Sequence, residues 1–131
     1  GGDILLSTTT DLKEWTPPQK VYTEQQDGPI PKVIANPPLE LKDRWILPYW
    51  RQNPRGTGGA ACQRQMHSKD HAGVLVSTDR GKTWAPRGHI VQPGAHDHAG
   101  QPGVDRLIEG ALVPLGDPRA VSPPPLLQLF R

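Results

Sequence analysis

The hydrophobic positions of the chain fall into short runs, most of them bounded by Gly, Pro, Asp or other turn-forming residues. The clearest runs are residues 3–8, 39–50, 73–78, 107–115 and 126–130. No window of a dozen residues keeps apolar positions at i, i+3, i+4 and i+7 without an intervening Pro or Gly, so helical periodicity is missing. Short continuous apolar runs between turn residues are typical of buried β-strands. The pattern predicts an all-β fold whose strands are mostly buried on both faces.

These runs are of two kinds, which alternate along the chain. One kind leads through a polar turn to a tryptophan, and the other is an apolar run, an Asp and a second apolar run. Trp15 and Trp84 lie 69 positions apart, and Asp43 and Asp117 lie 74 positions apart. Two independent markers therefore give nearly the same period, which indicates a repeated unit of short strands, as in propellers and solenoids.

The octapeptide STDRGKTW, which ends at Trp84, has a physical task for each of its specified positions. Asp79 can accept hydrogen bonds from backbone N–H groups of its own turn, and Gly81 supplies the positive φ that such a turn requires. Ser77 and Thr83 can satisfy further groups of the turn. Trp84 can bury its ring against a neighbouring sheet while its N–H keeps a hydrogen-bond partner. The octapeptide therefore predicts a structural turn between two strands, and not a catalytic motif.

The same octapeptide resembles, at every specified position, the Asp box (Ser-x-Asp-x-Gly-x-Thr-Trp) of the BNR repeats of sialidases, or neuraminidases, and related β-propellers. A degenerate copy, TTTDLKEW, keeps the leading hydroxyl of Thr8 and Trp15, but its Asp11 is displaced by one position and it has no Gly. In that family the box joins two strands at the outside of a blade. The resemblance implies the same place for the two copies here.

Two further segments, 36–50 and 107–131, resemble the inner hairpins of sialidase-like propellers, which have six blades. A chain of this length holds about two such repeats, and a closed propeller needs roughly four to eight blades. We therefore expect a fragment of a larger domain, which cannot close a ring alone and leaves strand edges exposed. The expected parts are residues 1–18 (end of one blade, with the degenerate box), 30–87 (one blade, with the box at 77–84) and 88–131 (start of the next blade).

Sialidases use a Tyr nucleophile activated by a Glu, an Asp general acid, and three Arg that bind the substrate carboxylate; the neutral Tyr avoids repulsion from the anionic sugar. The resemblance implies that Glu109, at the start of an inner strand, is the activating Glu. It also implies that Arg131, at the end of the next strand, is one of the three Arg. Residues 118–125 stand where a hairpin would have about two residues. Their four prolines cannot donate ladder hydrogen bonds, so they form a bulging loop or reflect a faulty gene model.

When the two segments are aligned through Asp43 and Asp117, Asn36 takes the same alignment position as Gly110. Asn36 would then lie at the same mouth of the channel as Glu109, where it could bind a sugar hydroxyl. The alternative is a turn residue before the two prolines that follow it.

The remaining parts of a sialidase site are not identifiable. Tyr22 and Tyr49 lie in early strands, whereas the family places its nucleophile far downstream. No general acid is identified, because Asp27 and Asp97 are loop carboxylates that turn chemistry explains better than a role as general acid does.

Loops 52–72 and 88–106 are rich in Gly, Gln and His, and we expect the long repeat period to arise there. His96 and His98, with His89 nearby, could share one face of an extended segment and hold a metal. A third ligand is not defined, so no metal is expected, and a loop that contacts glycan is an equal alternative.

Two other features have simpler explanations than binding. Residues 56–60, GTGGA, lack the Lys-Ser/Thr and the helix of a phosphate-binding loop. Trp45, Tyr49 and Trp50 could stack on sugar rings, but aromatic residues within a strand are more often core residues.

Composition and charge limit the kinds of partner that the chain is expected to bind. The net charge is +2 with Lys and Arg scattered, so no basic stripe indicates a nucleic-acid partner. No apolar run approaches the roughly 18 residues of a membrane span. The single Cys62 cannot form an internal disulfide. No cofactor is expected, and the compartment cannot be read from the chain.

These observations leave three functional hypotheses. The first is part of a sialidase-like glycoside hydrolase that removes a terminal acidic sugar from a glycan. The second is a non-catalytic Asp-box propeller that binds glycan or protein. The third is a polysaccharide lyase on a similar propeller, in which the His-rich loop would matter and no Arg triad would be needed.

Overall fold

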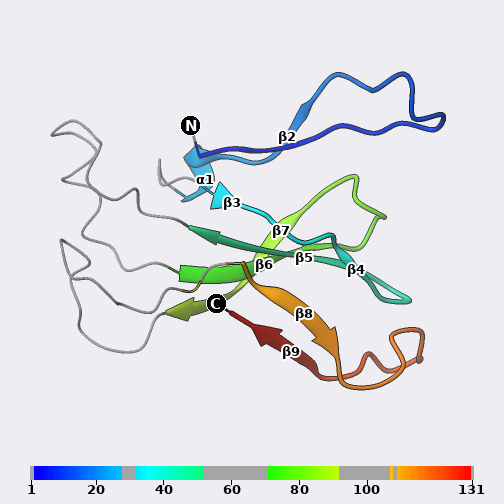
Figure 1. Cartoon of the computed structure of the whole chain (residues 1–131), viewed down its shortest axis with the longest axis vertical. Helices are drawn as coiled ribbons and strands as arrows, with labels where there is room; N and C mark the ends of the chain where they lie inside the picture. The colour runs from blue at the N-terminus through cyan, green and yellow to red at the C-terminus, as the bar shows by residue number, and fades with distance from the viewer. Residues whose placement is uncertain (1, 28–31, 52–70, 92–106, 108, 131) are drawn as a thin grey trace, which may run out of the picture.

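The structure, a computed structural model, describes residues 2–27, 32–51, 71–91, 107 and 109–130 (Figure 1). The elements in chain order are β1 (Ile4–Leu6), β2 (Gln19–Tyr22), α1 (Glu24–Asp27), β3 (Lys32–Val33), β4 (Leu39–Glu40), β5 (Trp45–Arg51), β6 (His71–Ser77), β7 (Ala85–Val91), β8 (Ala111–Pro114) and β9 (Leu126–Leu129). Strands dominate and the one described helix has four residues, so the all-β prediction is confirmed for this part of the chain.

A four-stranded antiparallel meander forms the middle of the molecule. β3 and β4 pair with opposite ends of the same edge of β5, Lys32 opposite Arg51 and Leu39 opposite Ile46. They are two parts of one edge strand, interrupted where consecutive prolines cannot donate ladder hydrogen bonds. β5 pairs with β6 along seven residues of each, and β6 pairs with β7. The spatial order therefore follows the chain order, from β3 and β4 through β5 and β6 to β7.

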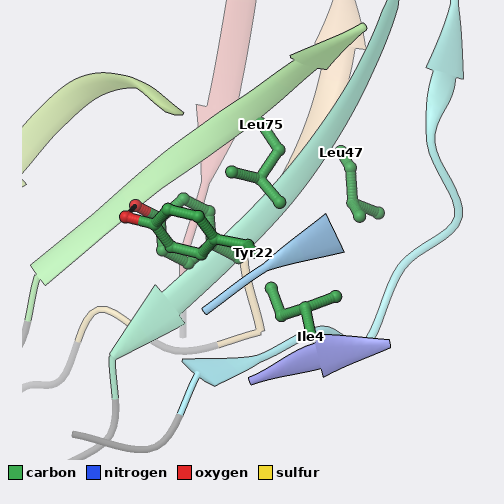
Figure 2. Packing of buried hydrophobic residues seen from close by; sticks show 5 residues of the cluster. Ile4, Tyr22, Leu47 and Leu75 are labelled. Carbon is green, nitrogen blue, oxygen red and sulfur yellow. Dashed lines mark hydrogen bonds between the residues drawn. The ribbon is translucent and has the colours of Figure 1, made fainter. Parts of the chain in front are cut away.

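Two separate hairpins flank this meander. β1 pairs with β2 and β8 pairs with β9, each as a two-stranded antiparallel sheet. In Figure 1 the β1–β2 hairpin lies above the meander and the β8–β9 hairpin lies below it. Figure 2 looks through the layers, with β1 and β2 in front of β5 and β6 and the C-terminal hairpin behind them. The described strands thus form three layers.

The core lies between the first hairpin and the meander (Figure 2). It consists of five buried side chains: Ile4, Tyr22, Leu47, Tyr49 and Leu75. Because alternate residues of a strand point to opposite faces, the neighbours of Leu47 and Tyr49 on β5 face the other way. Those neighbours, Ile46, Pro48 and Trp50, are buried as well, so both faces of β5 are covered.

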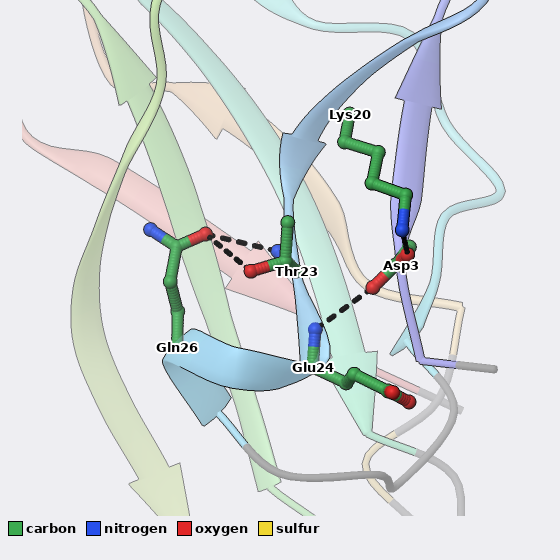
Figure 3. A network of polar contacts seen from close by, with 5 residues as sticks. All are labelled: Asp3, Lys20, Thr23, Glu24 and Gln26. Carbon is green, nitrogen blue, oxygen red and sulfur yellow. Dashed lines mark hydrogen bonds and ion pairs between the residues drawn. The ribbon is translucent and has the colours of Figure 1, made fainter.

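A short polar network fixes the end of the first hairpin (Figure 3). The Lys20 ammonium lies 2.7 Å from an Asp3 carboxylate oxygen, and the Glu24 backbone N–H donates to the other oxygen at 2.8 Å. The Gln26 side-chain oxygen accepts from the Thr23 backbone N–H at 2.9 Å. A Gln three residues after a Thr often caps the start of a helix in this way. This explains the single turn of α1, which the apolar pattern did not predict.

The structure corrects several boundaries. The run 39–50 contains two strands, β4 and β5, joined by a turn at 41–44, as expected from the Asp between its apolar halves, but the first strand is only two residues long. β2, β3 and β7 were not predicted because they are short or contain Lys, Gln, Pro and Gly in place of an apolar run. The first hairpin also includes β2, so it extends beyond the expected boundary at residue 18.

The prediction that strands are buried on both faces is wrong for the C-terminal hairpin. Val113 of β8 lies opposite Leu127 of β9, and both are exposed, as is Leu129. On the other face, Leu112 and Gln128 are partly buried. The alternation has a simple cause: the described residues cover only one face of this hairpin.

Candidate functional site

The loop between β6 and β7 contains the hydrogen bonds that its sequence predicts. Asp79 accepts from the Thr83 backbone N–H at 2.9 Å and from the Thr83 hydroxyl at 2.6 Å. The Ser77 hydroxyl donates to Asp79 at 2.8 Å and accepts from the Gly81 N–H at 2.7 Å. Gly81 has a φ of +85°, and its carbonyl accepts from the Trp84 indole N–H at 2.9 Å. Every specified side chain of the octapeptide is therefore used within the loop.

These contacts fix the charge and the packing of the loop. The Thr83 hydroxyl, the Thr83 N–H and the Ser77 hydroxyl lower the pKa of Asp79 from 3.8 to about 2, since each hydrogen bond favours the ionised form. The half-buried Trp84 ring packs against the core cluster. The loop therefore has a structural role in joining β6 and β7, and its contacts are explained without a bound substrate.

The degenerate loop corrects the sequence alignment. Its leading hydroxyl is Thr9, not Thr8: Thr9 donates to Asp11 at 3.1 Å and accepts from the Leu12 N–H at 2.9 Å. Asp11 also accepts from the Glu14 N–H at 3.0 Å. Thr9 and Asp11 have the same spacing as Ser77 and Asp79, and the loop is one residue shorter after Asp11. Asp11 is therefore not displaced; the Gly position is deleted.

The structure brings together two of the predicted site residues, Asn36 and Glu109. The side-chain N–H₂ of Asn36 donates to the Gly110 carbonyl at 3.0 Å and to the Glu109 carbonyl at 3.3 Å. These residues lie 73 and 74 positions from Asn36 in the sequence. The amide nitrogen of Asn36 therefore holds the start of β8 in place. This contact explains Asn36 better than a direct bond from its nitrogen to a sugar hydroxyl.

The backbone of Glu109 is strained. Its φ is +56°, in the left-handed region that a non-glycine residue rarely occupies. The following residue, Gly110, is closely packed, because a Cβ there would lie 2.8 Å from the Gln128 amide nitrogen and 3.1 Å from the Phe130 ring, so both side chains would have to shift. Strain of this kind costs about 1–3 kcal/mol and is found preferentially at functional sites. The Glu109 side chain itself is exposed.

Several predicted residues lie outside the described part of the chain. These are Arg131, Asp97, His96 and His98, with loop residues 56–60. Asp27 is the last residue of α1, and His89 is an exposed residue of β7. In the described residues, no group of three or more His, Cys, Asp and Glu side chains could hold a metal.

Sequence reasoning missed a cluster of buried cations and phenol rings at one end of β5. Lys32 and Arg51 are directly opposite each other in the β3–β5 register, and both are buried. The Lys32 ammonium lies 5.8 Å from the Tyr22 ring centre, and the Arg51 guanidinium 5.7 Å from that of Tyr49. The two rings pack edge to face at 5.5 Å. Arg51, at the end of an apolar run, was the one sequence signal for this cluster.

The aromatic residues of β5 divide between core and surface. Tyr49 and Trp50 are buried, which makes them core residues and not platforms for a sugar. Trp45 is half-buried and lines a polar cleft of about 380 Å³ between the β4–β5 turn and the 77–84 loop. Five charged side chains also line this cleft: Glu40, Lys42, Asp43, Arg44 and Arg80. The Arg44 guanidinium hydrogen-bonds Asp43 at 3.0 and 3.1 Å, which lowers the pKa of that carboxyl.

Compared with family models, curated proteins and solved structures, the chain matches none. In the part of the chain that the structure describes, no helix is long and apolar enough to cross a membrane. The site must therefore be interpreted from its own geometry.

Proposed function

We propose that this chain is part of a sialidase-like β-propeller domain that acts on glycans with a terminal acidic sugar, and that Glu109 is its activating carboxylate. The supporting observation is the strained backbone of Glu109, with φ of +56°, held by the Asn36 side chain. Glu109 directly precedes Gly110 and β8, the place where the sialidase resemblance puts the activating Glu.

The arrangement of strands supports the fold part of this proposal. A blade of a propeller is a four-stranded antiparallel sheet, and the meander of β3 to β7 has this form. The last two strands of the meander, β6 and β7, are joined by the loop that resembles the Asp box. The β1–β2 hairpin carries the related loop, and the β8–β9 hairpin repeats the form of β4 and β5. Three layers of this kind are expected from part of a propeller.

Glu109 has a specific role in this proposal. Its carboxylate would accept a proton from a nucleophile that attacks the sugar, as a general base does. Asn36 would act as a positioning residue, because its side-chain hydrogen bonds in the described part of the chain go to the backbone carbonyls of Glu109 and Gly110. Arg131 would supply one cation for the substrate carboxylate.

Hydrolysis of a fluorogenic sialoside by the complete domain tests the proposal. Glu109→Gln should lower turnover by about 10²-fold or more, the usual contribution of a general base, with the thermal unfolding midpoint unchanged. Glu14→Gln is the matched control, since Glu14 is an exposed Glu in the 9–15 loop. Turnover that is equal in the two variants would contradict the role of Glu109.

Binding without turnover would favour the second hypothesis, a glycan-binding module. Calorimetric titration with N-acetylneuraminic acid, with glucose as the neutral comparison, separates the two.

A further inference from the structure

The polar cleft at the β4–β5 turn, of about 380 Å³, has no part in the proposed function. The Asn36 side chain contacts Gly110, just before β8, whereas the Lys42 N–H donates to the Pro118 carbonyl, after β8, at 3.2 Å. The cleft therefore lies at the opposite end of β8 from Glu109. Its volume is within the range of about 300–1,000 Å³ that is usual for small-molecule sites, near the lower end. The cleft is large enough for a small ligand.

Hydrogen bonds within the two turns fix the walls of this cleft. In the β4–β5 turn, the Leu41 N–H donates to the Arg44 carbonyl at 2.8 Å. In the facing loop, the Ser77 hydroxyl accepts from the Gly81 N–H at 2.7 Å. Trp45 and Ser77 are paired in the β5–β6 register, which joins the two walls. A cleft that is formed in advance binds a ligand with a smaller cost of ordering its walls.

Trp45 supplies an aromatic surface in the cleft. Its ring lies against Gly81, where a Cβ would come within 3.1 Å of it, and the side chain is only half-buried. Apart from Leu41, which is buried, the other lining residues are polar or charged. A ligand that fits this lining has one nonpolar face for the indole ring and polar groups elsewhere. A sugar ring has this character.

The charges of the cleft favour an anion. Arg44 and Asp43 bind each other, because the Arg44 Nε–H donates to the two Asp43 carboxylate oxygens at 3.0 and 3.1 Å. Two further cations, Lys42 and Arg80, and one further carboxylate, Glu40, line the cleft and are exposed. The cations are therefore in excess. We propose that the cleft binds a sugar acid, such as a hexuronate, with its ring on the Trp45 indole and its carboxylate held by Lys42 and Arg80.

Calorimetric titration of the full chain with glucuronate tests the ligand class. Glucose lacks the carboxylate and inorganic phosphate lacks the ring, so glucuronate should bind at least several-fold more tightly than either. The affinity should fall as the salt concentration rises, because the two cations are exposed to solvent. Absence of glucuronate binding, or equal binding of glucose or phosphate, would overturn the proposal.

Three variants with the same loss of charge test the location. Lys42→Gln and Arg80→Gln should each weaken glucuronate binding by about three- to tenfold, since each removes one cation from an exposed charge-assisted contact. Lys82→Gln is the matched control, because Lys82 is exposed in the same loop as Arg80 and does not line the cleft. Circular dichroism checks that the variants keep their strands. An equal loss in all three would place the binding elsewhere and overturn the assignment.

This site and the proposed glycosidase site can fail separately. Glu109→Gln should leave the affinity for glucuronate unchanged, because Glu109 lies at the other end of β8, while it lowers sialoside turnover. If Glu109→Gln weakens glucuronate binding as much as Arg80→Gln does, the sugar acid binds at the Glu109 end and the proposed cleft is wrong. An inactive chain that still binds glucuronate through Lys42 and Arg80 would refute only the glycosidase proposal.

Discussion

The 9–15 and 77–84 loops share a pattern of hydroxyl and Asp hydrogen bonds and differ in packing. In both, a hydroxyl and an Asp two residues later bind the N–H groups of the turn. The longer loop has two positive-φ residues, Arg80 at +58° and Gly81 at +85°, and packs Trp84 on the core. The shorter loop has Leu12 at a φ of +61° and leaves Trp15 59% exposed. Local polar chemistry therefore tolerates the loss of one residue, whereas the packing of the tryptophan does not.

The largest expected difference between the loops concerns their tryptophans. Trp84→Ala should lower the free energy of unfolding by about 2–3 kcal/mol, somewhat below the cost for a fully buried Trp, because its ring packs on the core and its N–H binds Gly81. Trp15→Ala should cost under about 0.5 kcal/mol, as an exposed position does. Urea unfolding monitored by circular dichroism measures both. Similar losses would show that Trp15 also has a structural role.

The second difference concerns the glycine. Gly81→Ala should cost about 2 kcal/mol, because a Cβ at φ of +85° is strained and would lie 3.1 Å from the Trp45 ring. Gly88 is the matched control: its φ is +72° and a Cβ there meets nothing within 4 Å. Gly88→Ala should therefore cost only the backbone part, about 1 kcal/mol. If the two variants unfold at the same urea concentration, the contact with Trp45 contributes nothing.

The shorter loop should gain stability from a glycine at its positive-φ residue, Leu12. Leu12 is exposed and has a left-handed backbone conformation, so Leu12→Gly removes backbone strain without removing a buried side chain. The strain energy removed exceeds the entropic cost of a more flexible unfolded chain, so the free energy of unfolding should rise by about 0.5 kcal/mol. Lys13→Gly, one position later and without a positive φ, should be destabilising. A lower thermal midpoint for Leu12→Gly would refute this account of the loop.

The smallest expected effect is a pH dependence. The pKa of Asp79 is about 2 in the folded chain and 3.8 ordinarily, so the folded state favours the ionised form. This contribution to stability is present above about pH 4 and is lost as the pH falls towards 2. Asp79→Asn should flatten the profile of unfolding free energy in that window. Asp11, whose pKa is also lowered, mainly by the Glu14 and Lys13 N–H groups, should contribute in the same direction. A wild-type profile that is already flat there would contradict the assignment.

Local chemistry explains what could be predicted from the sequence. The 77–84 loop was predicted because its hydrogen bonds join residues at most four positions apart. The hairpins β4–β5 and β8–β9 could be predicted because each contains an apolar run, an Asp and a second apolar run. The degenerate loop was misaligned by one residue, because a deletion cannot be placed without seeing which hydroxyl binds Asp11.

Burial was the least predictable property. The sequence predicts strands buried on both faces, which holds for β5 but not for β8 and β9. The runs are similar in composition, and only the neighbouring layers differ. The same reason applies to Lys32 and Arg51, which polarity would place on the surface and the β3–β5 pairing buries.

The sequence by itself determined the all-β class and the turn that Asp79 holds, because these depend on interactions between near neighbours. Only the tertiary structure decided that Asn36 holds the backbone of Glu109 and that Trp84 rather than Trp15 joins the core. Such contacts join segments far apart along the chain, and their geometry is fixed only when the sheets stack.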